Sequence, residues 1–166
     1  MSNFLNKNFF KNFSIILSIF ALDRFSKIYV IFQNEKSLSA ELFESKYLNI
    51  NLIWNDGIAF GLLSFNEKIY YNLLTLVIIL ITLIILWMIV KAEGFEKIAF
   101  IMIFGGSIGN ICDRLYYSAV PDFIDFHINN FHWFIFNVAD IFITLGILFL
   151  ISIEIFNNKR VKNENY

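Results

Sequence analysis

Two aspartates stand at the borders of apolar stretches in this chain. Asp122 lies in "VPDFIDF", beyond one long apolar run, and Asp140 lies in "FNVAD", just inside the next. Neither has an oppositely charged residue three or four positions away, the spacing at which helical side chains pair. Two carboxylates that meet at a partly dry site have pKa values that move apart, so that one proton is shared. That state suits aspartyl proteolysis, in which one carboxylate takes a proton from water while the protonated partner polarises a carbonyl.

Further polar residues recur in the apolar runs. They are Asp23, Lys27, Asn110, Asp113, Arg114 and Asn137. Asp23 and Lys27 are four apart in the order that favours a helical ion pair, so a structural pair is expected there. Asp113 and Arg114 are expected to form a second charge pair between helices, and the two asparagines to form interhelical hydrogen bonds. Ionisable groups inside a bilayer are costly, and their gathering in one layer predicts a shared functional interior.

The composition is that of an integral membrane protein. Hydrophobic residues make up 58% of the 166 residues and charged residues only 16%, and the mean hydropathy is +0.64. This balance lies far from that of soluble domains. The net charge of −1 offers no basic surface, which argues against a nucleic-acid partner. One compact domain spanning residues 1–166 is expected.

Four apolar runs predict an all-α membrane protein with four transmembrane helices. The runs cover residues 13–32, 69–90, 99–116 and 133–156. One side of the predicted bundle carries Lys7, Lys11, Lys91, Lys97, Lys159, Arg160 and Lys162, and the other side only Lys36, Lys46 and Lys68. The positive-inside rule therefore predicts that both termini are cytoplasmic. The first run also has features of a cleaved signal peptide, but no small-residue cleavage site follows it.

Two outer segments, 33–68 and 117–132, are expected to form a small β element and a surface loop. Residues 48–52 alternate apolar and polar side chains before a turn signal at Asn55-Asp56-Gly57, a pattern typical of a hairpin or small sheet. Counting inward from Trp133 at ~1.5 Å per residue places Asp140 about 10 Å below the outer surface. Asp122 could reach the same level from the loop.

The sequence predicts neither a metal nor a cofactor. His127 and His132 lie five apart in an aromatic loop, and a zinc site would need more ligands at tighter spacing. Cys112 is the single cysteine, so it cannot form an internal disulfide. Gly105, Gly106 and Gly109 stand in an apolar run, where close packing of a neighbouring helix explains them better than phosphate binding.

Five short motifs in order carry a resemblance that covers almost the whole chain. They are "DRFSK" (23–27), "NDGIAFG" (55–61), "GGSIGNICDR" (105–114), "PDFID" (121–125) and "FNVAD" (136–140). Each motif alone is weak, but the set resembles the lipoprotein signal peptidase family, also called signal peptidase II. Small departures lie beside the motif positions: Asp56 and Ser107 stand where Thr and Ala are commoner, and Pro121 precedes the loop aspartate.

The resemblance implies a multi-pass enzyme of the bacterial inner membrane with its active site near the outer, periplasmic face. Such an enzyme removes the signal peptide from diacylglyceryl-modified prolipoproteins, before the lipidated cysteine, without a metal. Membrane lipid and a globomycin-type inhibitor are its implied further partners. Asp122 and Asp140 are the implied catalytic pair. The implied supporting residues are Asp23, Asn55, Gly57, Asn110, Asp113, Arg114 and Asn137, and Lys27 joins them through its expected ion pair.

Two other classes of protein stay open on the residues alone. A small proton-coupled transporter or channel would also bury ionisable groups, but it would spread them through the full bilayer depth. Here the inner halves of the second and fourth runs carry one ionisable residue, Glu154, close to the end of its run. An assembly subunit without chemistry would need neither aspartate, so single substitutions would distinguish it.

Overall fold

The computed structural model describes residues 2–36, 42–57, 68–129 and 131–164. These residues form four helices and three strands in the order α1 (Ser2–Lys36), β1 (Leu48–Asn55), α2 (Lys68–Lys91), α3 (Gly94–Tyr117), β2 (Val120–Ile128), β3 (Phe131–Phe136) and α4 (Val138–Glu164). The expected helical protein with a small β element is confirmed in this form.

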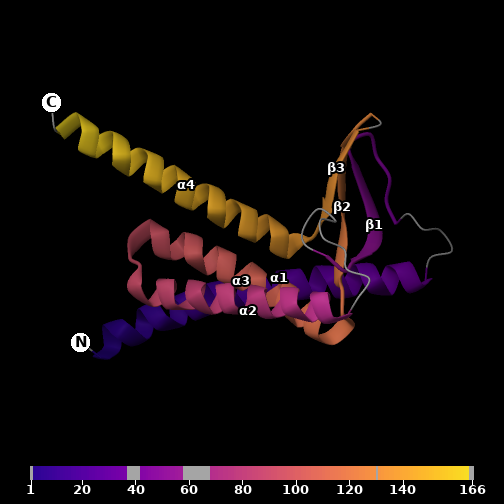
Figure 1. The fold of residues 1–166 in the computed structure, drawn as a ribbon, viewed down its shortest axis with the longest axis horizontal. Coiled ribbons are helices and arrows are strands. Elements are labelled where there is room, and N and C mark those ends of the chain that lie inside the picture. Colours follow the sequence, from indigo (N-terminus) through magenta and orange to yellow (C-terminus); the bar gives the residue numbers. More distant parts are fainter. Residues whose placement is uncertain (1, 37–41, 58–67, 130, 165–166) are drawn as a thin grey trace.

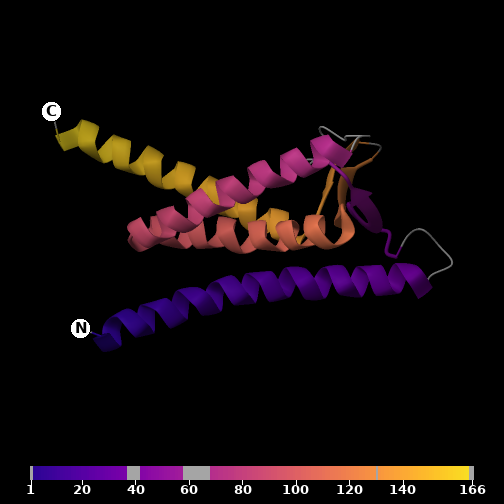
Figure 2. The same cartoon turned by 60° about the horizontal axis from the view of Figure 1, so that its bottom comes forward.

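Helix α3 is the centre of the bundle and packs against α1, α2 and α4. The helices run roughly lengthwise, and the sheet stands across one end of them (Figure 1). The start of α1 and the end of α4 both lie at the opposite end, as the turned view also shows (Figure 2). Asp122 in β2 and Asp140 in the first turn of α4 therefore both lie at the end where the helices meet the sheet.

Three helices among the described residues are long and apolar enough to cross a membrane: Lys68–Lys91, Gly94–Tyr117 and Val138–Asn157. Helix α2 exposes large apolar side chains such as Leu73, Leu80 and Ile84 while it buries Thr75 and Thr82. Outward-facing leucine and isoleucine suit contact with lipid. A membrane span for α1 and the cytoplasmic position of both termini stay predictions.

Helix α1 begins earlier than expected, at Ser2 and not at residue 13, whereas the fourth run is helical only in its later part. Residues 133–136 belong to β3, and α4 begins only at Val138, so the prediction of a helix from Trp133 is wrong. A short apolar run suits a buried helix or a strand equally, and here pairing with β2 decides. The depth count from Trp133 fails for the same reason, because Asp140 lies in the first turn of α4.

The two outer segments and residues 133–136 together build one antiparallel sheet in the order β1-β2-β3. The expectation of a surface loop at 117–132 is wrong, because most of that segment forms β2. Strand β1 pairs with β2 from Leu48↔Phe126 to Asn55↔Val120, so its partner strand comes from the second outer segment. The expected turn at Asn55 is present, with the Gly57 N–H donating to Asn55 Oδ1 over 2.9 Å. Residues 58–67, into which that motif continues, lie outside the described part of the chain.

The glycines of α3 mark close helix contacts, as the sequence predicts. A Cβ atom on Gly106 would lie 2.5 Å from the backbone oxygen of Ala139 in α4, and one on Gly109 would lie 2.5 Å from Asp23 Oδ2 in α1. Neither approach leaves room for a side chain. These two positions let α3 bring α1 and the start of α4 together at the level of the polar cluster.

Candidate active site

Asn137 joins the two aspartates. Its side-chain Nδ2 donates to Asp122 Oδ1 over 2.6 Å, and its backbone N–H donates to Asp140 Oδ2 over 3.1 Å. The Asp140 N–H donates back to Asn137 Oδ1 over 3.1 Å. This reciprocal pattern is a capping box, with Asn137 as the N-cap and Asp140 at the third helical position. The local start of α4 thus orients one aspartate and binds the other.

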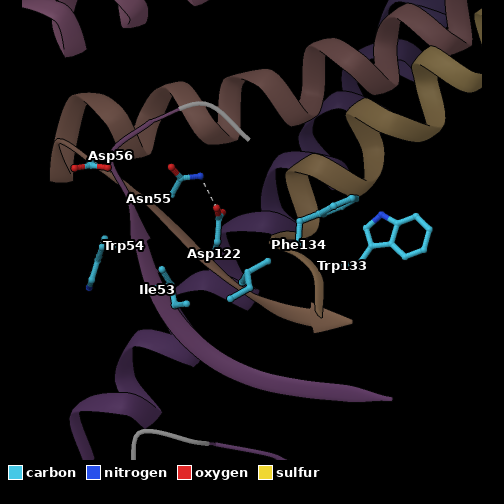
Figure 3. A pocket seen from close by; sticks show the side chains of 8 residues that line it. Ile53, Trp54, Asn55, Asp56, Asp122, Trp133 and Phe134 are labelled. Atoms are coloured by element: carbon cyan, nitrogen blue, oxygen red, sulfur yellow. Dashed lines mark hydrogen bonds between the residues drawn. The ribbon is translucent and has the colours of Figure 1, made fainter. Parts of the chain in front are cut away.

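The remaining oxygens of the pair also receive amide donors. Asn55 Nδ2 donates to Asp122 Oδ2 over 2.8 Å, a bond drawn in Figure 3. Asn110 Nδ2 donates to Asp140 Oδ1 over 2.8 Å from the middle of the bundle. Each carboxylate is therefore held at both oxygens, by residues of β1, α3 and the start of α4. Such fixed donors preorganise both acids before a substrate arrives.

The pKa of Asp122 is raised from its ordinary value of 3.8 to about 6. Burial is the largest cause, because a low-dielectric site disfavours the charged carboxylate, and the nearby charge of Asp140 adds to it. The amide donors of Asn55 and Asn137 act in the opposite direction by stabilising the ionised form. Asp122 can therefore carry a proton near neutral pH, as an acid and base pair requires.

A buried charge network lies next to the pair. Lys27 Nζ lies 2.9 Å from Asp23 Oδ1 and 2.7 Å from Asp113 Oδ2, and it donates to Asn110 Oδ1 over 2.8 Å. Both Asp23 and Lys27 are fully buried, and their expected ion pair is confirmed. The ammonium thus uses three acceptors, one of which belongs to the asparagine that binds Asp140.

Asp23 also caps the helix that carries Asp140. Its Oδ1 accepts the Ala139 N–H over 3.0 Å, which satisfies one of the N–H groups that the start of α4 leaves free. A carboxylate at this position is favoured by the positive end of the helix dipole. Helix α1 is therefore part of the site, which argues against treating residues 13–32 as a removed signal peptide.

The expected pair between Asp113 and Arg114 is wrong. Asp113 instead pairs with Lys27 and with Arg24, whose Nη2 lies 2.6 Å from Asp113 Oδ1. Arg114 donates to the carbonyl oxygens of Gly57, over 3.0 Å, and Asn110, over 3.3 Å. Consecutive residues on a helix point in different directions, which explains the separate partners. Arg114 thereby connects α3 to the turn after β1.

Sequence reasoning missed Arg24, which lies between the two residues of the confirmed ion pair. Its Nη2 contacts Asp113 and also lies 3.0 Å from Asp23 Oδ2. The positive charges of Arg24 and Lys27 thus balance the negative charges of the two aspartates. The signal was present in "DRFSK", but helical spacing alone does not show which charge of a neighbouring helix will face it.

A cavity of about 350 Å³ opens beside Asp122. It lies between β1 and β3, and Figure 3 shows the side chains around it. Its lining residues are Ile53, Trp54, Asn55, Asp56, Asp122, Trp133, Phe134 and Ile135. An apolar and aromatic wall next to the carboxyl of Asp122 suits a peptide segment with apolar side chains. The sequence did not predict this cavity.

Residues 15–156 match the model of the family described as Signal peptidase (SPase) II. The chain belongs to the signal peptidase II family. A lipoprotein signal peptidase of Pelagibacter ubique is 47% identical over 160 residues, which cover 96% of each chain. One from Aquifex aeolicus is 37% identical over 165 residues, or 98% of this chain and 96% of the relative. The family resemblance expected from the five motifs is therefore confirmed.

Two solved structures share the fold of this chain. A bacterial membrane enzyme with 27% identity superposes with a TM-score of 0.72 and covers 90% of both chains. A second one, with 28% identity, has a TM-score of 0.64 and covers 86% of this chain and 90% of its own. Together with the apolar helices, these likenesses identify a bacterial membrane protein of a peptidase family. None of these relatives supports the transporter alternative.

Proposed function

We propose that this signal peptidase II family member is an intramembrane aspartyl endopeptidase. Its substrate would be a diacylglyceryl-modified prolipoprotein, cut before the lipidated cysteine so that the signal peptide is released. The observation that carries the proposal is the pair Asp122 and Asp140, because Asn137 donates a hydrogen bond to each of them. The named relatives, which are lipoprotein signal peptidases, supply the substrate class.

Each acid has a role in this mechanism. The ionised carboxylate takes a proton from a water molecule, which attacks the scissile carbonyl, while the protonated carboxyl donates a hydrogen bond to that carbonyl oxygen. The proton then passes to the leaving amine, and the two acids exchange roles. Asn55, Asn110 and Asn137 hold the carboxylates in place, and the buried charges of α1 and α3 hold Asn110 and α4. The reaction needs no metal and no cofactor.

We further propose that the whole chain, residues 1–166, acts as one domain in the inner membrane. With α1 as a fourth span and both termini cytoplasmic, the sheet lies on the outer, periplasmic face, where the cleavage region of a lipid-anchored precursor also lies. The acyl chains would remain in lipid while the cleavage region enters the cavity beside Asp122.

A comparison of two precursors tests the substrate class. Each buried methylene of an acyl chain contributes about 0.8 kcal/mol to anchoring, so the diacylglyceryl group holds the cleavage region at one depth. Without lipid, the flexible segment must be ordered from solution on entering the site. We expect efficient cleavage of the lipidated precursor, little or none of the matched unlipidated one, and inhibition by globomycin. The released signal peptide is measured by mass spectrometry with purified enzyme in nanodiscs, and equal cleavage of both precursors contradicts the proposal.

Activity should depend on pH through the proton shared by the aspartates. Because the pKa of Asp122 is about 6, kcat/KM should fall as the pH rises through that region and the proton leaves the free enzyme. Asn55→Ala removes a donor that stabilises the ionised carboxylate, so the pKa should rise and the alkaline limb should move to higher pH.

The measurement is the pH profile of kcat/KM for the lipidated precursor. Glu96→Gln is the control, since Glu96 is exposed in the first turn of α3, and its profile should coincide with that of the wild type. An Asn55→Ala profile that stays in place, or moves to lower pH, shows that Asp122 is not the group observed.

A further inference from the structure

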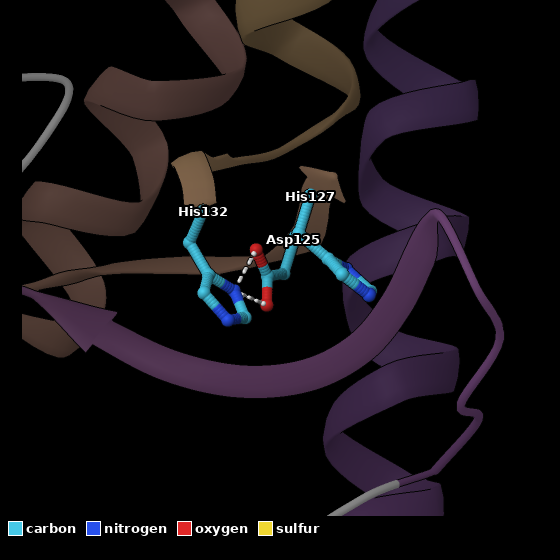
Figure 4. Close-up of side chains that lie close together, drawn as sticks. All are labelled: Asp125, His127 and His132. Carbon is cyan, nitrogen blue, oxygen red and sulfur yellow. Dashed lines mark hydrogen bonds and ion pairs between the residues drawn. The ribbon is translucent and has the colours of Figure 1, made fainter. Parts of the chain in front are cut away.

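A group of three metal-ligating side chains lies on the sheet, apart from the paired aspartates. Asp125 and His127 belong to β2 and His132 to β3, and one ligand atom from each lies within 4.8 Å of the other two. Figure 4 shows the three side chains together. Side chains of a strand alternate between its two faces, so Asp125 and His127 share a face that Asp122 does not. The group is therefore separate from the site of cleavage.

A register shift between β2 and β3 assembles this group. The pairing Asp125↔Ile135 changes to His127↔His132 across an irregularity in the ladder. Without that shift, Ile128 would stand opposite His132, and His132 would point to the other face of the sheet. A bulge that redirects a side chain is a common device beside functional sites. Here it brings His132 onto the face that Asp125 and His127 already share.

An ion pair alone does not explain the group. His132 Nδ1 lies 2.8 Å from Asp125 Oδ2, and that contact would satisfy both residues. His127, however, is buried with 9% of its surface exposed, and its Nδ1 has no hydrogen-bond partner among the described residues. Its ring stacks on that of His132 with centroids 5.0 Å apart. A buried ring nitrogen without a partner, next to a second imidazole and a carboxylate, suits coordination of a metal ion.

From these contacts we propose that Asp125, His127 and His132 bind a zinc ion that connects β2 to β3. Two imidazoles and one carboxylate are ligands that zinc accepts, whereas magnesium and calcium prefer oxygen ligands alone. Ligands ~2.0–2.1 Å from a tetrahedral zinc stand about 3.3 Å apart, so the group would close around the ion. His132 can move to do so because its side chain is 54% exposed. The fourth position would hold water.

The bound ion would brace the strand that carries Asp122 and the strand that leads into the helix of Asp140, without taking part in cleavage. Strand β2 holds Asp122, and β3 leads directly to Asn137 and α4. This inference does not rest on the proposed peptidase function, because zinc binding is measured without any substrate. It also differs from the sequence expectation, which considered the spacing of the two histidines and not the aspartate that the sheet adds to them.

Zinc binding is tested on the full-length protein, purified without a polyhistidine tag and stripped of metal with a chelator. His127 and His132 are the two histidines of the chain, so replacing both removes every imidazole. We expect saturable uptake of one zinc per chain by calorimetry, no uptake of magnesium under the same conditions, and a higher Tm with zinc. His132→Gln and His127→Gln should each weaken zinc binding at least about tenfold. Cys112→Ala, which removes the single cysteine, should bind as the wild type does.

The exposed position of His132 keeps the test decisive even where His127→Gln folds poorly. Cobalt in place of zinc provides a second measurement, because its visible absorption reports a tetrahedral site and should vanish in His132→Gln. Zinc uptake that is absent in the wild type overturns the proposal. Uptake that persists unchanged in the double variant His127→Gln with His132→Gln overturns it equally.

Discussion

Replacing Asp122 or Asp140 with asparagine is expected to lower kcat/KM for a lipidated precursor by a factor of about 10²–10⁴, the contribution typical of a positioned acid or base. Asparagine keeps the size of the side chain but cannot exchange a proton. At position 140 its oxygen can still accept the N–H of Asn137, which preserves the cap of α4, but the amide of Asn110 then loses its acceptor. At position 122 both oxygens receive amide donors, and asparagine can accept at only one of them.

The comparison needs a measure of folding beside the measure of rate. Melting temperatures of both variants should stay close to that of the wild type, with changes of similar size because each variant loses one acceptor. Glu96→Gln, an exposed acid replaced by its amide, should keep full activity. If both aspartate variants keep more than about a tenth of the wild-type rate, the loss is too small for an acid and base pair. That result would show that the pair is not catalytic.

Lys27→Met is expected to have the largest effect on stability. Methionine has a similar length, but the change leaves Asp23 and Asp113 in the bundle with Arg24 as their remaining cation. Breaking a buried ion pair by removing one partner costs about 3–5 kcal/mol. The yield and the melting temperature should fall. The folded fraction should also cleave more slowly, because Asn110 loses the ammonium that orients it toward Asp140.

A double variant separates lost charge balance from lost packing. Lys27→Met combined with Asp113→Asn removes one positive and one negative charge, so part of the stability should return, with a coupling of about 0.5–3 kcal/mol. Lys91→Met, at the exposed end of α2, is the matched control and should melt as the wild type does. A normal melting temperature for Lys27→Met would show that the network is not structural, and a normal melting temperature with lost cleavage would place Lys27 in turnover instead.

Local patterns were sufficient for several features of this protein. The apolar runs identify the membrane protein, because a bilayer selects for long helices without charge. The pair Asp23 and Lys27 could be predicted because residues four apart on one helix are neighbours whatever the rest of the fold does. The candidate aspartates stood out since neither had such a neighbour. The family followed from five motifs in order, and the comparisons confirm it.

Other features depend on which segments meet in space, and the sequence alone did not determine them. Residues 133–136 could continue a helix or form a strand, and only pairing with β2 makes them a strand. Asp113 has cations of α1 within reach because Gly109 lets that helix approach, so the adjacent Arg114 is free to bind the turn after β1. His132 joins Asp125 and His127 only through a shift of one residue in the strand register. Contacts of this kind are set by packing between distant segments, so a periodic pattern in the sequence does not predict them.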